Sequence, residues 1–387
     1  MDSIELNDRT ELVSLLRDLV SIPSVNTAYQ ANLSERELGR YVQDFFARLG
    51  LSCVTQEVFP GRENVIARLD GSRPDRTLLF EAHMDTVSVT GMTIDPFNPK
   101  IEGDRLYGRG SCDTKAGLAA MMHALKTIAQ GHMTPRATIL LAATIDEEHA
   151  FRGVTRLVES GLRANGAIVS EPTQLQIVVA HKGCVRWKIR TCGRAAHSYK
   201  VHLGINAITK MAKALGAFEK RLGAAYAGRL HPLLGVPTFN VGLIEGGIQL
   251  NTVPDSCTIQ VDRRLLSGET HEAVYSEFQE VLADLEREDP EFLAVMEPPL
   301  LESLPLETPG GDSIVTVARE ACSHVLGDAR LVGVPYGTDA SRLSRAGIPS
   351  IVLGPGSIDQ AHTAAEYVEI EQVVQAAGIY ADIMRSF

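Results

Sequence analysis

The chain has 387 residues, of which 48 are acidic and 37 basic, so its formal net charge is −11. A length of this kind predicts about two or three domains, and 44% hydrophobic with 22% charged residues is typical of a globular protein. Because like charges repel, the acidic balance disfavours phosphate backbones and anionic lipid surfaces as partners. We therefore expect neither a nucleic acid partner nor membrane association.

The opening stretch and the cysteines bear on the cellular compartment. MDSIELNDRTELVSLL has no basic segment leading into an apolar one, and no small-residue cleavage site, so we expect no signal peptide. No apolar run approaches the roughly 18 residues that a membrane span requires. The six cysteines are scattered without a C-x-x-C pair, which is typical of a reduced chain. The sequence thus favours the cytoplasm.

In chain order, the first half alternates helical and strand-like segments. Two amphipathic helices are predicted at 10–20 and 35–50, and Gly50 is placed to cap the second. Strands are predicted at 53–59, 64–70, 76–82, 137–145 and 167–171. Between them lie a buried-looking helix at 115–131 and a shorter helix at 155–161. This alternation predicts an α/β sheet covered by helices.

The pattern changes after residue 182. The predicted order is strand, helix, strand, strand, helix, strand, at 185–193, 204–222, 238–246, 257–265, 271–288 and 292–298. This split β-α-β arrangement is typical of a compact two-layer module. A Pro-rich stretch marks the end of this module. After it, a helix at 313–326 and a strand at 348–354 return to the alternation of the first half. We predict a catalytic domain of residues 1–181 and 301–387, with residues 182–300 inserted in it.

Ionisable residues gather where the predicted strands end. In an open α/β sheet the side chains beyond the carboxyl ends of the strands share one crevice, so distant segments can converge there. A Gly-rich turn that enters a predicted helix adds one more carboxylate, Asp113. The candidates that follow strands are His83, Asp85, Asp146, Glu147, Glu148, Glu171 and His362.

So many ionisable groups in one crevice require neutralising cations, because their burial and mutual repulsion are costly. Imidazole and carboxylate without thiolate suit zinc, or manganese or cobalt, better than calcium. Three carboxylates and two imidazoles are enough for two metals about 3.5–4 Å apart that share one bridging carboxylate. Asp85, two residues after His83, is placed to accept the second imidazole N–H rather than to bind metal.

Several alternatives remain open at this point. Glu147 and Glu148 could be solvated loop charges, and Asp113 could be a helix N-cap. GRGSCD after a short strand is similar to the glycine turn of dinucleotide-binding proteins, but Asp113 stands at the sixth position, where its charge would oppose a pyrophosphate. A binding protein that kept the fold without catalysis is a third class.

The motifs HMDTV, LYGRGSCDTKAG, IDEE, SEPT and GPGSIDQAHTAAEYV closely resemble the ArgE/DapE/aminoacylase/carboxypeptidase-G family of two-zinc metallohydrolases, over most of the chain. The resemblance implies that His83 and Glu171 bind one metal, that Glu148 and His362 bind the other, and that Asp113 bridges them. It further implies a mixed sheet covered by helices, as in zinc peptidases, with an inserted ferredoxin-like lid that dimerises.

The resemblance also implies an amide hydrolysis in which two metals activate a bridging water and Glu147 accepts its proton, with Asp85 behind His83. His197, in GRAAHS, would stabilise the oxyanion in a neighbouring subunit. Asn251 and Arg264 match lid positions that bind the substrate. An ion pair within the lid is an equally good use of Arg264.

For the substrate, the resemblance is greatest to the acetylornithine deacetylase and succinyl-diaminopimelate desuccinylase branch. It favours removal of an acyl group from an N-acyl amino acid, with a carboxypeptidase or dipeptidase acting on short peptides as the alternative. VPYGTDASR is expected to line the pocket, with Gly337, Thr338 and Asp339 as candidates, although a Gly-rich turn needs no ligand to explain it.

Overall fold

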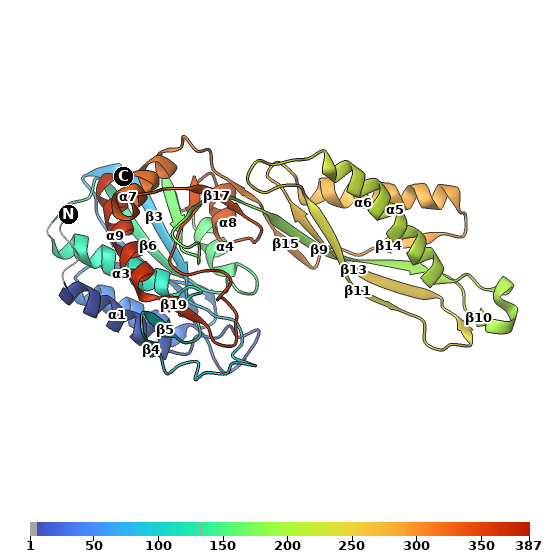
Figure 1. The fold of residues 1–387 in the computed structure, drawn as a ribbon, viewed down its shortest axis with the longest axis horizontal. Helices are drawn as coiled ribbons and strands as arrows, with labels where there is room; N and C mark the ends of the chain where they lie inside the picture. The colour runs from blue at the N-terminus through green and yellow to red at the C-terminus, as the bar shows by residue number, and fades with distance from the viewer. Residues whose placement is uncertain (1–5, 132) are drawn as a thin grey trace. The chain divides into compact units, whose positions relative to one another are not determined.

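The computed structural model describes residues 6–131 and 133–387, which form two compact units (Figure 1). The first contains the chain up to Val179, Thr308–Val332 and Thr338–Phe387, and the second contains Ala180–Glu307 and Gly333–Gly337. The second unit extends to Glu307, beyond the predicted exit, because a strand in the Pro-rich stretch pairs inside it. The prediction for the opening residues falls partly on 1–5, outside the described residues.

The first unit is built on a mixed sheet. Its strands include, in spatial order, β1 (Ser52–Phe59), β2 (Arg62–Leu69), β6 (Ala137–Thr144), β3 (Arg73–His83), β7 (Gly166–Val169), β18 (Ser350–Val352) and β8 (Ile177–His181). The central strands β6, β3, β7 and β18 are parallel to one another, whereas β1, β2 and β8 pair antiparallel. The mixed α/β sheet expected from the sequence is therefore confirmed.

The two middle strands explain why their sequence reads as a continuous apolar run. Every residue of β6, ATILLAAT, is buried, as are the last six residues of β3. A parallel strand covered on both faces has no solvent side and shows no alternation. The register pairs His83 with Thr144 and Glu81 with Val169. The ends of β3, β6 and β7 consequently lie at one edge of the sheet.

Helices cover this sheet. α1 (Leu6–Ser21), α2 (Arg36–Arg48), α3 (Lys115–Gln130), α7 (Ser313–Leu326) and α9 (Ile370–Ser386) share one apolar core with it. α3 packs between α1 and α9, while α4 (Arg152–Glu159) and α8 (Ala340–Arg345) contact each other (Figure 1). Gly50, just beyond α2, adopts φ +70°, which agrees with its predicted capping role.

The second unit has its own core. Its sheet has the order β11 (Thr238–Gly246), β13 (Ser256–Leu265), β9 (Gly183–Cys192) and β14 (Leu293–Met296), and β15 (Leu301–Ser303) also pairs with β9. α5 (Ala207–Ala227) and α6 (His271–Glu288) pack on it around Trp187, Phe218 and Phe278. Along the chain the order is β-α-β-β-α-β, as the sequence pattern predicts.

Short elements complete the described chain. They are β4 (Lys100–Glu102), β5 (Arg105–Tyr107), β10 (Ala196–His197), the 3₁₀ turn η1 (Ser198–Leu203), β12 (Thr252–Val253), β16 (Leu306–Glu307), β17 (Leu331–Val334) and β19 (Tyr367–Glu369). β19, β5 and β4 form a small antiparallel sheet. Among residues 6–131 and 133–387, no helix has the length and apolar character needed to cross a membrane.

Candidate metal centre

The predicted strand-end residues of the first unit converge at one edge of its sheet. His83 ends β3, Glu147 and Glu148 lie three and four residues after the end of β6, and Glu171 follows β7. His362 lies in the loop between β18 and β19. Because β3, β6 and β7 are parallel, their carboxyl ends meet, which is the physical reason for the convergence.

Asp113 lies at the middle of this cluster. One of its carboxylate oxygens, Oδ1, is 3.1 Å from Nε2 of His83, and the other, Oδ2, is 3.3 Å from Nε2 of His362. The same His362 nitrogen is 3.1 Å from Oε1 of Glu148, and Nε2 of His83 is 3.8 Å from Oε1 of Glu171. Each imidazole thus shares Asp113 and has one glutamate of its own.

Within the described part of the chain, two overlapping groups of possible ligand atoms are close enough to hold ions. In each group the atoms lie within 4.8 Å of one another, and the groups are His83, Glu147 and Glu171, and His83, Asp113 and Glu148. His83, Asp113 and Glu171 are buried, whereas the His362 side chain is half exposed.

Burial acts strongly on the carboxyl groups. It raises the pKa of Glu147 and of Glu171 well above the ordinary value, and the pKa of Glu148 to about 7, with the charge of Asp113 adding to the shift of each. Asp113 behaves oppositely: burial opposes its ionisation, but hydrogen bonds to His362 and His83 hold its pKa below the usual range. All four carboxyl groups can therefore be ionised together only if additional cations compensate their charge.

The imidazoles respond to the same charges. Burial alone lowers the pKa of His83, but the hydrogen bond to Asp113 and the charge of Glu171 outweigh burial and raise it well above its ordinary value. Hydrogen bonds to Asp113 and Glu148 raise the pKa of His362 to about 10. The proton on each imidazole faces the carboxylates. A bound cation would neutralise the carboxylates in its place. The donor set therefore fits a pair of divalent metal ions.

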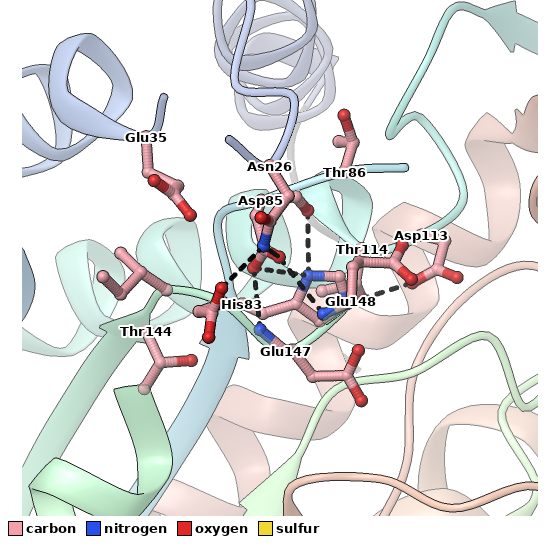
Figure 2. A network of polar contacts seen from close by, with 12 residues as sticks. Asn26, Glu35, His83, Asp85, Thr86, Asp113, Thr114, Thr144, Glu147 and Glu148 are labelled. Atoms are coloured by element: carbon pink, nitrogen blue, oxygen red, sulfur yellow. Dashed lines mark hydrogen bonds and ion pairs between the residues drawn. The ribbon is translucent and has the colours of Figure 1, made fainter. Parts of the chain in front are cut away.

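Asp85 contacts its neighbours differently from the expectation. Nδ1 of His83 is 3.0 Å from the backbone oxygen of Asp85 and 3.7 Å from its carboxylate, so the carbonyl is the hydrogen-bond partner of the ring. The carboxylate accepts hydrogen bonds from the backbone N–H groups of Glu147 and Glu148, each at 3.1 Å (Figure 2). It is occupied there because Asp146, with φ 67°, turns both amides toward it. Asp85 thus fixes the turn that carries the two glutamates.

Several supporting residues were not identified from the sequence. Asn26 Nδ2 donates to Asp85 at 2.8 Å (Figure 2) and to Asp146 at 3.0 Å. Glu81, buried on β3, has its pKa raised to about 7 by burial. Burial also raises the pKa of Asp339, which is already a pocket candidate from the sequence, well above its ordinary value. A charged residue inside the apolar run RTLLFEA was the available signal for Glu81. Asn26 carries no comparable signal.

The local structure also decides between the alternatives for Asp113. The N-cap residue of α3 is Thr114, and no side chain caps this helix end by a hydrogen bond. Asp113 instead directs its carboxylate to the two imidazoles. A capping role therefore does not explain this residue.

Three further predicted positions belong to the second unit. In the second unit, exposed His197 ends β10, with Nδ1 accepting from the Tyr199 amide at 3.5 Å. Asn251 is exposed, and its carbonyl accepts from the Ser198 amide at 2.9 Å. Arg264 donates from Nε to Asp262 at 2.7 Å, which is the ion pair considered as its alternative role.

The glycine-rich turn before α8 is tightly packed. A Cβ added at Gly337 would lie 2.7 Å from Oγ of Ser303, within the second unit. In the first unit, Thr338 is buried, and its Oγ1 accepts from the amide of Ala340 at 3.3 Å. Packing and helix initiation account for both residues, so neither requires a ligand.

Comparison with known proteins agrees with this geometry. The sequence model of the family described as "Peptidase family M20/M25/M40" matches residues 79–386. Acetylornithine deacetylase from Myxococcus xanthus is 30% identical over 384 residues, which cover 97% of both chains.

Solved structures share the fold. Aminopeptidase PepT from Bacillus cereus has a TM-score of 0.82 and 25% identity, covering 97% of this chain and 98% of that one. The YXEP protein from Bacillus subtilis, a dinuclear metal-binding peptidase from the M20 family, has a TM-score of 0.75 and 17% identity, with 98% of both chains covered. The resemblance of the motifs is confirmed: the chain belongs to peptidase family M20/M25/M40 and is a metallohydrolase.

Proposed function

We propose that the protein hydrolyses the amide bond of N-acyl amino acids, as an acetylornithine deacetylase does. The observation that carries the proposal is the Asp113 carboxylate, which offers one oxygen to each of two imidazoles that have glutamate partners. Support for the substrate class comes from the relative of 30% identity, whose name is acetylornithine deacetylase.

Two divalent metal ions would bind at this cluster, zinc in the first place and cobalt or manganese as substitutes. His83 and Glu171 would hold one ion, His362 and Glu148 the other, and Asp113 both. When bound, the ions lower the pKa of water and polarise the substrate carbonyl.

Glu147 is the general base of the proposed reaction. It would accept a proton from water as the water oxygen bonds to the amide carbon, and would pass that proton to the leaving nitrogen as the C–N bond breaks. Burial already raises the pKa of its carboxyl, which suits a group that must take up and release a proton near neutral pH. His197 of the partner subunit would donate to the developing oxyanion, and Asn251 and Arg264 of the lid would bind the substrate.

A second candidate is hydrolysis of short peptides by a carboxypeptidase or dipeptidase activity. Peptide hydrolysis in general is favoured by the likeness to the aminopeptidase from Bacillus cereus, at 25% identity and a TM-score of 0.82. The same metal pair can cleave both kinds of amide, so the residues that contact the substrate side chain decide between them.

A panel of N-acetyl amino acids, N-succinyl amino acids and dipeptides, given to zinc- or cobalt-loaded protein, tests the proposal. We expect the N-acyl amino acids to have the highest kcat/KM. Fast dipeptide cleavage with no turnover of any N-acyl amino acid would replace the proposal with the second candidate. Failure on every substrate by a fully metal-loaded protein would overturn both.

The second unit would join two copies of the chain. β11 lies at the edge of its sheet, and large apolar side chains on and after this strand are exposed: Leu243, Ile244, Ile248 and Leu250. An uncovered strand edge with apolar neighbours pairs readily with another chain. A homodimer formed through this edge would also bring His197 of one subunit to its partner.

The cysteines favour a reducing compartment. All six are free, and Cys112, Cys184, Cys257 and Cys322 are buried. We infer a cytoplasmic location from this usage of cysteine.

A further inference from the structure

Glu366 is a buried carboxylate that the proposed reaction does not use. It lies four residues after His362, directly before β19, and is 0% exposed. An ionised carboxylate without solvent must be compensated by cations and hydrogen-bond donors. The identity of those donors indicates what the residue does.

Four donors from one segment surround this carboxylate. Oε2 accepts from Arg109 Nη1 at 2.6 Å and from the backbone N–H of Gly110 at 3.1 Å. Oε1 accepts from the backbone N–H of Cys112 at 2.9 Å and of Asp113 at 3.0 Å. The carboxylate thus fixes the backbone of the turn that ends at the central residue of the metal centre.

Arg109 extends this attachment to the second histidine. Its Nη2 donates to the backbone oxygen of Ser88 at 3.0 Å and of Thr363, the residue after His362, at 3.5 Å. His362 itself has φ 61°, a conformation that needs support from its surroundings. Glu366 and Arg109 therefore hold the backbones of two separate ligand-bearing segments together.

Unlike an ordinary buried ion pair, the Glu366 carboxylate also contacts the backbone of a proposed metal ligand. The Asp113 amide donates to Glu366, while the Asp113 side chain lies 3.1 Å from one imidazole and 3.3 Å from the other. A shift of a few tenths of an ångström in this backbone would move the oxygen that faces each imidazole. Metal affinity depends on such positions, because hydrogen bonds behind the ligands orient them.

We propose that Glu366 is a positioning residue for the metal centre, holding Asp113 and the His362 segment at the spacing that two metal ions require. This inference rests on the proposed function, since it presupposes that metal binds. In Glu366→Gln an amide NH₂ would replace one acceptor and face donors, and Arg109 would lose its counter-charge. In Glu366→Asp the charge remains but the shorter side chain reaches fewer donors.

Zinc affinity tests the proposal. We would titrate the metal-free full chain with zinc in competition with a chromophoric chelator, and record the visible spectrum of the cobalt-loaded protein. A matched control is Asp289→Asn in the second unit, where Asp289 accepts from Lys210 at 2.8 Å, from Lys213 at 2.6 Å and from the Glu291 amide at 3.2 Å. This variant loses a similar set of hydrogen bonds, at a residue far in sequence from the proposed metal ligands.

Glu366→Gln is expected to weaken zinc binding about 10–100-fold and to change the cobalt spectrum. Glu366→Asp, which also serves if the first variant does not fold, should show a smaller loss in the same direction, and Asp289→Asn should bind zinc as the unchanged protein does. Equal zinc affinity and equal cobalt spectra in the Glu366 variants and the unchanged protein would overturn the positioning role alone. An unchanged protein that binds no zinc would overturn the proposed metal centre and this role with it.

Discussion

Among single residues, Glu147 has the most direct consequence for activity. We expect Glu147→Gln to lower kcat about 10²–10⁴-fold, because a general base contributes that much. The metal content should be unchanged, since His83, Asp113, Glu148, Glu171 and His362 remain. Turnover together with elemental mass spectrometry checks this, with exposed Glu159→Gln as a control that leaves both values unchanged. Loss of metal in proportion to activity would make Glu147 a ligand instead.

His362 makes metal binding depend on pH. Its pKa is raised from 6.5 to about 10 by Asp113 and Glu148, so the metal-free protein carries this proton at neutral pH. The proton stabilises the metal-free fold fully below pH 6.5, and that stabilisation is lost as the pH rises through about 10.

Metal needs the neutral imidazole, so zinc binding must displace the proton. We therefore expect zinc affinity to rise with pH up to about pH 10, the pKa of His362, by about tenfold per pH unit for each proton released. Calorimetric titration in two buffers of different ionisation enthalpy measures the protons. Identical binding enthalpies in both buffers would show that none is released.

The sequence predicts which ionisable residues converge at the strand ends, but not the residues that support them. His83, Glu148 and Glu171 could be found because each follows a strand, and strand ends converge by topology. Asn26 and Glu366 could not, because their importance lies in hydrogen bonds to groups more than fifty residues away: the Asp85 carboxylate for Asn26, and backbone amides such as that of Cys112 for Glu366.

The close approach of α3 to the end of β7 gives a prediction for whole elements. A Cβ at Gly117 would meet Oγ of Ser170 at 1.6 Å and its Cβ at 2.6 Å, so Gly117→Ala must push the helix from the strand. Such overpacking costs about 1–3 kcal/mol. Because Asp113 precedes α3 and Glu171 follows Ser170, zinc affinity should fall as well.

A second helical glycine provides the control. Gly216 in α5 is exposed, and nothing lies within 4 Å of an added Cβ. Gly216→Ala should stabilise the protein by about 0.5–1 kcal/mol, since alanine favours the helix. Urea unfolding of both variants measures the difference. Stabilisation by Gly117→Ala to the same degree would show that α3 has room to move.

Long apolar elements could be predicted from the sequence, whereas short ones could not. The buried helix α3 and the strands β3 and β6 follow from their composition. β4, β5 and β19 have three residues each, too few for a periodic pattern, and exist because they pair with one another. α9 was not predicted, although its buried positions recur at helical spacing.

For the molecule as a whole, the prediction concerns assembly. Replacing both Ile248 and Leu250 by Lys should convert the expected dimer into a monomer, because these side chains are 87% and 105% exposed beside the β11 edge. Leu230→Lys, at a residue 74% exposed elsewhere in the second unit, should leave the dimer unchanged. Light scattering gives both masses. A monomeric unchanged protein would refute the proposed dimer.

The sequence predicts an inserted module from the split β-α-β order after residue 182. Its details depended on pairing. The second unit extends to Glu307 and takes in Gly333–Gly337, because β15 pairs with β9 and the amide of Lys182 bonds to the carbonyl of Val334. The Pro-rich stretch contains the boundary at Glu307 but does not fix its exact residue, and no composition change marks Gly333–Gly337.

A crystal of the zinc-loaded protein, with diffraction recorded on both sides of the zinc absorption edge, would locate the ions themselves. Our account predicts two anomalous peaks about 3.5–4 Å apart, one beside His83 and one beside His362, with Asp113 between them. A single peak, or peaks only at other residues, would contradict it.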